Sequence, residues 1–421
     1  MNDIIRDRQI RKFSYYGFFK NLKFFEPYFF IYLLSHDYNL FYIGIIFAVK
    51  KLTVYILEIP SGAFADNFGR KTAMIISFIA YIASFILFFA SSRLIVLIIG
   101  MILLGTGDAF RTGTHKAIIM DYLDKMDWSR YKTAVYGRTR SFSLIGSALS
   151  SFASIVFVLN IPALRWIFLV TVVPYVIDFL LILSYPGYLN ATGNRALLRM
   201  SIFGQIRESF REIAENRYLS IHITASSVFD GVFDILKDYI QPILQTMVIA
   251  GSVMIIGNLS ADDNTMILLG ILYGVFNIVS SFSSRNAHRL QSLTRTANLI
   301  NGLFIIGAIT IISMSTVIFN DKILLLIACF LILHIIKNIR RPLIIGYLGD
   351  HMRSENRATI LSGESQLKVI IAALWAPAAG FIAEYIGVGY VFLFTGIIFL
   401  LIGALTVFMQ RGLPDKQKSK T

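Results

Sequence analysis

Ionisable side chains gather in four stretches of this chain that are otherwise apolar enough to cross a membrane. A charged residue at mid-depth in a bilayer costs at least roughly 2.5–3.5 kcal/mol on insertion scales, so clusters of them indicate a water-accessible interior. The four clusters are Lys20, Lys23 and Glu26; Asp108, Arg111, His115 and Lys116; Asp230, Asp234, Lys237 and Asp238; and His334, Lys337, Arg340 and Arg341.

These side chains could carry two kinds of chemistry. A carboxyl group in a low-dielectric cavity favours its protonated form, so it can load and release a proton as access to it changes. The candidates for this role are Glu26, Asp108 and Asp234. Basic groups could neutralise an anionic or zwitterionic substrate, and the candidates are Lys23, Arg111, Lys237 and Lys337.

Structural ion pairs are the alternative interpretation of the same charges. Asp108 and Arg111, for example, lie one helical turn apart, and neighbouring cations oppose protonation of a carboxylate. The other charges inside apolar runs we interpret as packing or gating charges. They are Lys50, Lys51, Glu58, Asp178, Glu364 and Lys368.

The sequence offers little for other chemistry. The single cysteine, Cys329, permits neither a disulfide framework nor a cysteine-based metal site within one chain. Phosphate-cradling loops of the Walker type and zinc-binding helix motifs are absent, and His115 and His334 are single. We therefore expect no catalytic residue, no metal site, no cofactor and no enzymatic activity.

Twelve apolar runs of membrane length hold these charges. The chain has 421 residues, of which 56% are hydrophobic, and a mean hydropathy of +0.67. Long apolar runs satisfy their backbone groups in a bilayer only as helices, which predicts an all-α integral membrane protein with about 12 transmembrane helices. The runs lie near 13–34, 40–63, 72–90, 94–121, 133–158, 165–185, 218–249, 264–284, 296–318, 322–349, 357–384 and 388–410.

Helical spacing places the charges of each cluster on one face. At about 100° per residue, three members of a cluster fall within a sector of about 60°. The three sets are Asp108, Arg111 and His115; Asp230, Asp234 and Lys237; and His334, Lys337 and Arg341. Each of these helices is therefore predicted to carry one polar stripe, and prolines inside the runs, such as Pro27 and Pro242, provide sites for bends.

The distribution of basic residues predicts the topology. A net charge of +14 could indicate a nucleic-acid partner, but most of the 39 lysines and arginines fall in the termini and in alternate loops. The opposite loops hold only Arg93, Arg165 and Lys322. Such asymmetry places both termini in the cytoplasm, and we expect no nucleic-acid partner.

A charged segment divides the twelve runs into two sets of six. We predict an N-terminal six-helix bundle at 1–185, a cytoplasmic linker at 186–217 and a C-terminal six-helix bundle with a basic tail at 218–421. In the linker, apolar residues recur at helical spacing between residues 203 and 213, which predicts an amphipathic helix on the membrane surface.

The loop after the second run contains the most specific motif, GAFADNFGRK, from Gly62 to Lys71. Gly62 would allow close helix approach and Gly69 a tight turn, while Asp66 could accept from a facing helix N-terminus or a basic side chain. Arg70 and Lys71 would anchor at the cytoplasmic surface. In spacing and in place, the motif resembles the first cytoplasmic-loop motif of the major facilitator superfamily of transporters.

That resemblance implies two six-helix bundles that rock around a central site, with the motif as part of a cytoplasmic latch. It also implies that the first, fourth, seventh and tenth helices line the cavity, and these are the helices with charge clusters. The equivalent loop of the second half keeps Arg285, Arg289 and Arg295 but lacks the glycine–aspartate pattern, so the latch is expected to be asymmetric.

Two departures from the family's patterns bear on function. Proton-driven drug exporters often carry an arginine four residues before a glycine in the fourth span, and here Met101 stands four before Gly105. The fifth span reads SLIGSALSSFAS, without the proline of the antiporter motif. The motifs therefore give no support to proton antiport.

We expect a secondary active transporter of a small organic solute that works by alternating access and is coupled to protons. Sodium as the coupling ion and either direction of transport stay open. The alternatives are a facilitative uniporter of the same fold and a non-transporting membrane sensor or assembly partner. We expect a monomer in the cytoplasmic membrane of a prokaryote, with the bilayer and a small-molecule substrate as its partners.

Overall fold

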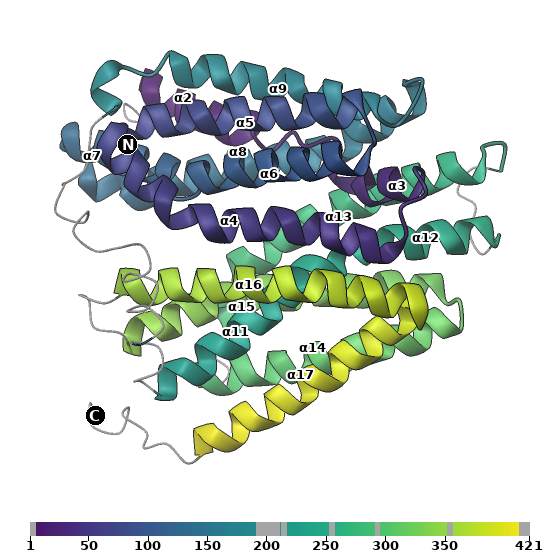
Figure 1. The fold of residues 1–421 in the computed structure, drawn as a ribbon. Helices are drawn as coiled ribbons and strands as arrows, with labels where there is room; N and C mark the ends of the chain where they lie inside the picture. The colour runs from purple at the N-terminus through teal and green to yellow at the C-terminus, as the bar shows by residue number, and fades with distance from the viewer. Residues whose placement is uncertain are drawn as a thin grey trace. The chain divides into compact units, whose positions relative to one another are not determined.

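Helices make up the structure, and the part of the chain that it describes contains no strand (Figure 1). The computed structural model describes residues 6–190, 211, 217–251, 257–290, 295–351 and 357–411. The predicted all-α class is confirmed for these residues. The predicted surface helix of the linker lies outside them.

Ten helical spans of the described chain are long and apolar enough to cross a membrane. They agree with ten of the twelve predicted runs. The helices that form them are α4 (Leu40–Phe68), α5 (Arg70–Ala90), α6 (Leu94–Arg111) together with α7 (Thr114–Lys125), α8 (Lys132–Asn160), α9 (Trp166–Leu183), α13 (Ala261–Leu290), α14 (Thr296–Phe319), α15 (Ile323–His351), α16 (Arg357–Tyr385) and α17 (Val388–Arg411).

The predicted first and seventh spans are each interrupted near a charge cluster. In the first, α2 (Arg8–Phe19) is separated from α3 (Phe29–Leu34) by irregular chain and the 3-10 turn η1 (Glu26–Tyr28). In the seventh, α11 (Arg217–Leu236) and α12 (Ile240–Ile249) flank the turn η5 (Lys237–Tyr239). Interrupted backbone at membrane depth is tolerated only where protein buries it or water reaches it, so both breaks are candidate solute-binding regions.

The fourth span also differs from its prediction. Helix α6 ends at Arg111, and α7 begins at Thr114 after Gly113, whose φ of 81° lies in the left-handed region. The expectation that Asp108, Arg111 and His115 form a stripe on one continuous helix is therefore wrong, because a left-handed glycine interrupts the 3.6-residue period. The tenth span, in contrast, is the single helix α15.

Contacts between helices divide the chain into two compact units. The first contains residues 1–202 and 244–278, and the second contains residues 203–243 and 279–421. In the first, α5 packs against α6 and α9, α4 packs against α6, and α2 packs against α8. In the second, α14 packs against α15 and α17, and α11 packs against α16. The bundle boundaries predicted at 1–185 and 218–421 stay a prediction.

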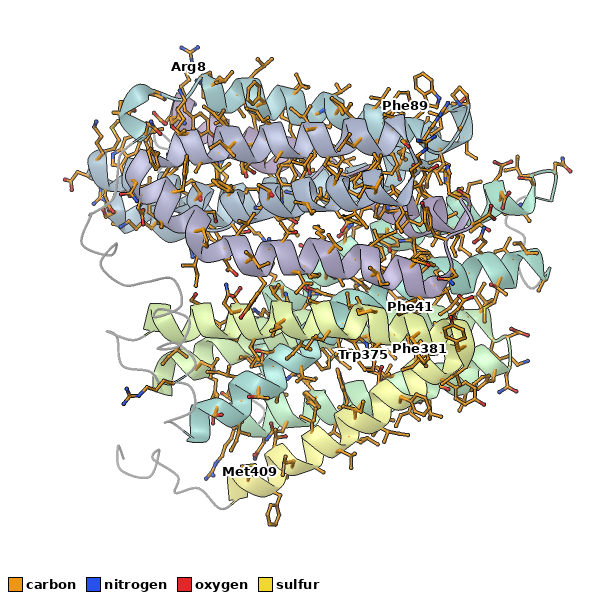
Figure 2. The ribbon with its side chains drawn as sticks, in the orientation of Figure 1. Arg8, Phe41, Phe89, Trp375, Phe381 and Met409 are labelled. Atoms are coloured by element: carbon orange, nitrogen blue, oxygen red, sulfur yellow. The ribbon has the colours of Figure 1, made fainter. Side chains whose placement is uncertain are left out.

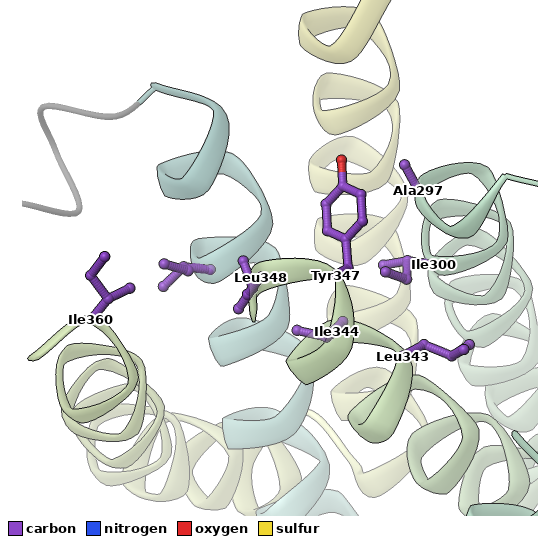
Figure 3. Close-up of a cluster of buried hydrophobic side chains, with 8 residues drawn as sticks. Ala297, Ile300, Leu343, Ile344, Tyr347, Leu348 and Ile360 are labelled. Atoms are coloured by element: carbon purple, nitrogen blue, oxygen red, sulfur yellow. The ribbon is translucent and has the colours of Figure 1, made fainter. Parts of the chain in front are cut away.

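One core of the second unit joins four helices. Side chains from α11, α14, α15 and α16 form a continuous apolar cluster that includes Tyr347 and Leu348 (Figure 3). Its other members are Ile223, Ala297, Ile300, Leu343, Ile344 and Ile360. This core holds α15, which carries the fourth charge cluster, against its neighbours.

Large apolar side chains also stand along the outer faces of the helices (Figure 2). Leu324 on α15 is 78% exposed, Phe408 on α17 is 77% exposed, and Phe381 near the end of α16 is 50% exposed. Such exposure would be a liability in water but suits helices surrounded by lipid tails.

Candidate functional site

Asp108 lies at the centre of a charge network in the first unit. Its Oδ2 lies 2.9 Å from Lys50 Nζ of α4, and the Tyr81 hydroxyl of α5 donates to its Oδ1 at 2.6 Å. Arg111 contributes a longer ion pair of 3.9 Å and donates from Nε to the Tyr81 hydroxyl oxygen at 3.1 Å. The network joins α4, α5 and α6 and compensates the negative charge of Asp108.

A cavity of about 260 Å³ lies beside this network, inside the first unit. Its walls come from α2, α6, α7 and α8 and from the chain that joins them. Lys20, Arg111, Lys116 and Arg140 line it, and no carboxylate of the described chain is part of that lining. Such a site suits a small anion, or the anionic end of a larger solute, because the solute supplies the negative charge that the walls lack.

Close packing of α2 against α8 forms one wall of the cavity. Gly17 makes this possible, since a Cβ at that position would lie 2.8 Å from both Ser143 Oγ and Thr139 O. Both α8 residues line the cavity beside Gly17. A larger residue at position 17 would force the two helices apart and change the shape of the site.

Aromatic rings and His115 form another wall. The Tyr16 ring stacks on the His115 imidazole with a centroid distance of 3.6 Å, and Phe13 meets the same imidazole edge-on at 5.6 Å. His115 Nε2 lies 3.2 Å from the hydroxyl oxygen of Tyr185, just beyond the end of α9. This wall connects the cavity to the region where α2 and α9 pack together.

The second unit contains a denser set of ion pairs. Arg341 of α15 pairs with Glu364 of α16, with Nη2 and Oε2 3.0 Å apart, and its Nη1 lies 3.4 Å from Asp230 Oδ2 of α11. Lys368 Nζ lies 3.2 Å from Asp234 Oδ2. These pairs tie α11, α15 and α16 together.

Cations of α15 in the same unit also contact aromatic rings. The guanidinium of Arg340, which is 1% exposed, lies 4.2 Å from the ring centre of Phe229 and 4.9 Å from that of Phe304. Lys337 Nζ lies 5.1 Å from the ring centre of Phe233. Cation–π contacts of this kind stabilise buried charge without an anion.

The structure brings the predicted site residues together within each unit. In the first, Lys23 interacts electrostatically with Asp108, and Glu26 interacts electrostatically with Lys20. In the second, Asp234 and Lys237 both interact electrostatically with Lys337. Whether these residues bind solute or couple ions stays a prediction.

Several important side chains escaped the sequence reasoning. Lys50, Glu364 and Lys368, interpreted as packing or gating charges, are the ion-pair partners of the clustered charges. Tyr81 and Tyr185 were missed because tyrosine does not stand out in an apolar run. The available signal was that a buried phenol needs a hydrogen-bond partner.

The motif between α4 and α5 contacts several helices of the first unit, at the helix ends that are predicted to face the cytoplasm. Arg70 forms an ion pair with Asp121 of α7, and its Nη2 lies 3.8 Å from Asp66 Oδ1. Lys71 Nζ donates to the carbonyl oxygens of Leu183 at 2.8 Å and Tyr185 at 2.6 Å. The motif thus ties α4, α5, α7 and the end of α9 together.

The two glycines of the motif differ in their environment. Gly69 has a φ of 101°, as expected for a tight turn between α4 and α5. A Cβ on Gly62 would meet no atom of the described chain within 4 Å, so the close helix approach expected there is not seen.

Comparison with known proteins identifies the family. A sequence model described as Major Facilitator Superfamily matches residues 15–362. The chain belongs to the Major Facilitator Superfamily. It is therefore a multi-pass membrane transporter and not an enzyme, and the resemblance inferred from the Gly62–Lys71 motif is confirmed.

Known members of the superfamily support this at two levels. An uncharacterised MFS-type transporter of Bacillus subtilis (strain 168), YxaM, is 25% identical over 229 residues, which are 53% of this chain and 55% of the relative. The match thus spans about half the length of that relative.

Solved structures of the superfamily share the fold. The nucleoside transporter NupG is similar with a TM-score of 0.73 and 12% identity, covering 95% of this chain and 98% of its own. A D-xylose–proton symporter is similar with a TM-score of 0.68 and 10% identity, covering 94% and 96%. At these identities the likeness concerns the fold alone.

Proposed function

We propose that this protein is a secondary active transporter that moves a small anionic organic solute by alternating access, coupled to protons. The observation that carries the proposal is the cavity of the first unit, lined by four cations beside the Asp108 network. We further propose that it works as a monomer in the cytoplasmic membrane of a prokaryote, with both termini in the cytoplasm.

The charge of the cavity supports an anionic solute. Lys20 is 9% exposed and has no ion pair within 4 Å in the described chain, whereas Lys116 and Arg140 are exposed. A buried cation without an ion-pair partner gains free energy when an anion enters its site. A carboxylate or phosphate group could contact Lys20 and Arg111 together, and the rings of Tyr16 and Phe13 could cover its apolar part.

Proton coupling is supported by a carboxylate beside the cavity that lies within reach of several cations. Asp108 is compensated by Lys50 and Arg111. A solute that draws one of these cations away would change the proton affinity of the nearby carboxyl groups, which is the physical basis of coupling. The fold is also that of a D-xylose–proton symporter.

The motif contacts support alternating access by movement of a bundle as one body. Arg70 and Lys71 join α5 to α7 and to the end of α9 within the first unit. Elements joined in this way can rotate together, so that access changes by rocking around the solute.

Reconstitution tests the proposed function. The purified protein is placed in liposomes that contain a pH-sensitive dye and is given labelled lactate, inorganic phosphate, glucose 6-phosphate or, as a neutral comparison, xylose. We expect one class of anion to drive proton flux and to accumulate under an imposed proton gradient. Transport of the neutral sugar alone would contradict the anionic substrate.

The other possible outcomes separate the alternatives. Accumulation under a sodium gradient but not under a proton gradient would indicate that sodium is the coupling ion. Equilibration without accumulation would indicate a uniporter. No flux of any probe, in preparations that remain folded, would favour the membrane sensor.

A matched pair of variants ties the transport to the cavity. Arg111→Gln should lower the affinity for the transported anion, whereas Arg165→Gln should not. Arg165 is an exposed arginine at the start of α9, where it lies 5.7 Å from the ring centre of Phe89 and does not line the cavity. Equal affinity in both variants would remove Arg111 from the site.

A further inference from the structure

Asp178 is the most deeply buried carboxylate of the first unit. Its side chain lies on the buried face of α9, which also presents Thr171, Tyr175 and Ile182 at helical spacing. Asp178 is 0% exposed, and neither of its carboxylate oxygens has a hydrogen-bond partner among the described residues. The side chain therefore points into the protein and not toward lipid.

Such a carboxyl group is not a packing charge. A buried ionised carboxylate without hydrogen bonds or an ion-pair partner is so costly that the group takes up a proton instead. A structural role would instead require partners like those of Glu364, which pairs with Arg341. The sequence interpretation of Asp178 as a packing or gating charge therefore has no contact to support it.

Lys20 is placed to change the protonation state of Asp178. Tyr175, about one turn before Asp178 on α9, donates from its hydroxyl to the backbone carbonyl of Lys20 at 3.2 Å, and Lys20 interacts electrostatically with Asp178. Lys20 lies where α2 ends, is almost completely buried and lines the cavity. It also interacts with Asp108 and Glu26, so Asp178 competes with other anions for the same ammonium group.

The remaining titratable neighbours of Asp178 are aromatic. Tyr16 of α2, Tyr175 of α9 and Tyr185 beyond its end all interact electrostatically with it. Helix α5 contributes Tyr81, whose ring lies 5.2 Å from that of Tyr175. Helix α8 contributes no charge that acts on Asp178 in the part of the chain that is described.

Tyrosine side chains that interact electrostatically with Asp178 also belong to the cavity wall or contact it, although none is hydrogen-bonded to Asp178 in this structure. The Tyr16 ring is part of the cavity wall, and its hydroxyl has no hydrogen-bond partner in the described chain. Tyr185 reaches the same cavity through its hydroxyl contact with His115. Phenol and imidazole groups can pass a proton between a buried carboxyl group and cavity water.

We propose that Asp178 is the proton-carrying group of this transporter, and that it shares Lys20 with the anionic solute. While Asp178 holds a proton and is neutral, as its unpartnered oxygens in this structure indicate, Lys20 is available to a solute anion. When Asp178 loses its proton to cavity water, Lys20 pairs with it and releases the anion. This inference rests on the proposed function for its solute, but the protonation of Asp178 can be tested without one.

The direction of proton transport relative to solute transport follows from the shared lysine. Protonation of Asp178 frees Lys20 for the anion, so proton and solute bind together and travel in the same direction. By linkage, solute affinity rises as the pH falls, and solute binding takes up protons at pH values where part of Asp178 is ionised. The end of α9 is held by Lys71 of the latch motif, so movement of the latch would shift Tyr185 and open or close the route.

Infrared spectroscopy of the full-length protein in lipid tests the protonation directly. We expect the C=O stretch of a protonated carboxyl group at neutral pH, its loss at alkaline pH, and its absence from Asp178→Asn. The matched control is Asp108→Asn, which removes an ion-paired carboxylate and should keep the band. A band that survives in Asp178→Asn, or that disappears in Asp108→Asn instead, would overturn the proposal.

A second variant tests the role of Lys20 and does not alter Asp178. In Lys20→Met, the carboxyl band should persist to a higher pH, by about one unit or more, because the cation that favours the ionised form is gone. An unchanged titration would show that Lys20 does not control Asp178. This result also decides the matter if Asp178→Asn proves too unstable to purify.

Transport measurements separate this inference from the proposed function. With the anion that drives proton flux in the wild type, Asp178→Asn should lose accumulation under a proton gradient but keep exchange of labelled for unlabelled anion. Coupled accumulation that persists in this variant would overturn the role of Asp178 while leaving proton-coupled transport intact. If the wild type moves no protons but the carboxyl band behaves as expected, the proposed coupling fails while Asp178 remains a protonated group.

Discussion

Both units of the chain contain charges inside their helices but arrange them differently. In the second unit, Arg341 contacts both Asp230 and Glu364, and Lys368 contacts Asp234. In the first unit, Asp108 is compensated, but cations line a cavity without carboxylates and Asp178 has no partner in the described chain.

This difference separates stabilising charges from reactive ones. A paired charge network resists change because removing one member leaves another buried and uncompensated. An unpaired carboxyl group beside a cation-lined cavity can change state at little structural cost. We infer that the second unit uses its charges mainly to hold α11, α15 and α16 together and that the first unit carries the solute and proton chemistry.

The largest effect on stability is expected from the paired network. Glu364→Gln removes a buried partner of Arg341, and loss of one member of a buried pair typically costs about 3–5 kcal/mol. Thermal unfolding of the purified protein should show a marked loss of stability. The double variant Glu364→Gln with Arg341→Met should recover part of the lost stability. Equal stability of Glu364→Gln and the wild type would contradict a structural role for the paired charges of the second unit.

The largest effect on solute binding is expected in the first unit. Arg111→Gln removes a charged donor from the cavity wall, and a hydrogen bond to a charged group contributes about 1.5–3 kcal/mol. Affinity for the transported anion should fall by roughly 10- to 100-fold. The same readout on Arg341→Gln, which lies in the paired network of the other unit, should change less, and the reverse order would contradict the assignment of roles.

The latch motif should affect turnover more than binding. Arg70→Gln removes the contact with Asp121 and should slow exchange by about tenfold, equivalent to about 1.4 kcal/mol on the barrier. Asp66→Ala removes only the longer contact with Arg70 and should slow exchange less. Wild-type turnover in both variants, with protein present in the membrane, would reject the latch assignment.

The smallest effect on stability is expected at Asp178. Asn resembles the protonated form of the carboxyl group in size and charge, and no described partner is lost, so Asp178→Asn should lose much less stability than Glu364→Gln. Its solute affinity should lose the rise toward acidic pH that the wild type is expected to show. A loss of stability as large as that of Glu364→Gln would mean that Asp178 is a paired structural charge after all.

Most of the fold could be predicted from the sequence because lipid imposes simple rules. Ten predicted runs agree with the helical spans, and the motif from Gly62 to Lys71 placed the chain in its family. The breaks in the first, fourth and seventh spans were harder to find. Hydropathy does not register a left-handed Gly113, and Pro27 indicated only that a bend was possible.

The site could be predicted in composition but not in pairing. Helical spacing identified Asp108 and Arg111, whereas the shorter contact of Asp108 is with Lys50 of another helix. Asp178 looked like any other isolated charge in an apolar run. Only the packing of α9 against α2 and α5 shows that its carboxylate is buried without a partner.

The most direct test of this account is solute-driven proton uptake in liposomes, measured side by side for the wild type, Asp178→Asn and Asp234→Asn. We expect proton uptake to disappear in Asp178→Asn while anion exchange continues, and to persist in Asp234→Asn. Proton uptake that survives in Asp178→Asn but is abolished in Asp234→Asn would place the coupling chemistry in the second unit and contradict the account.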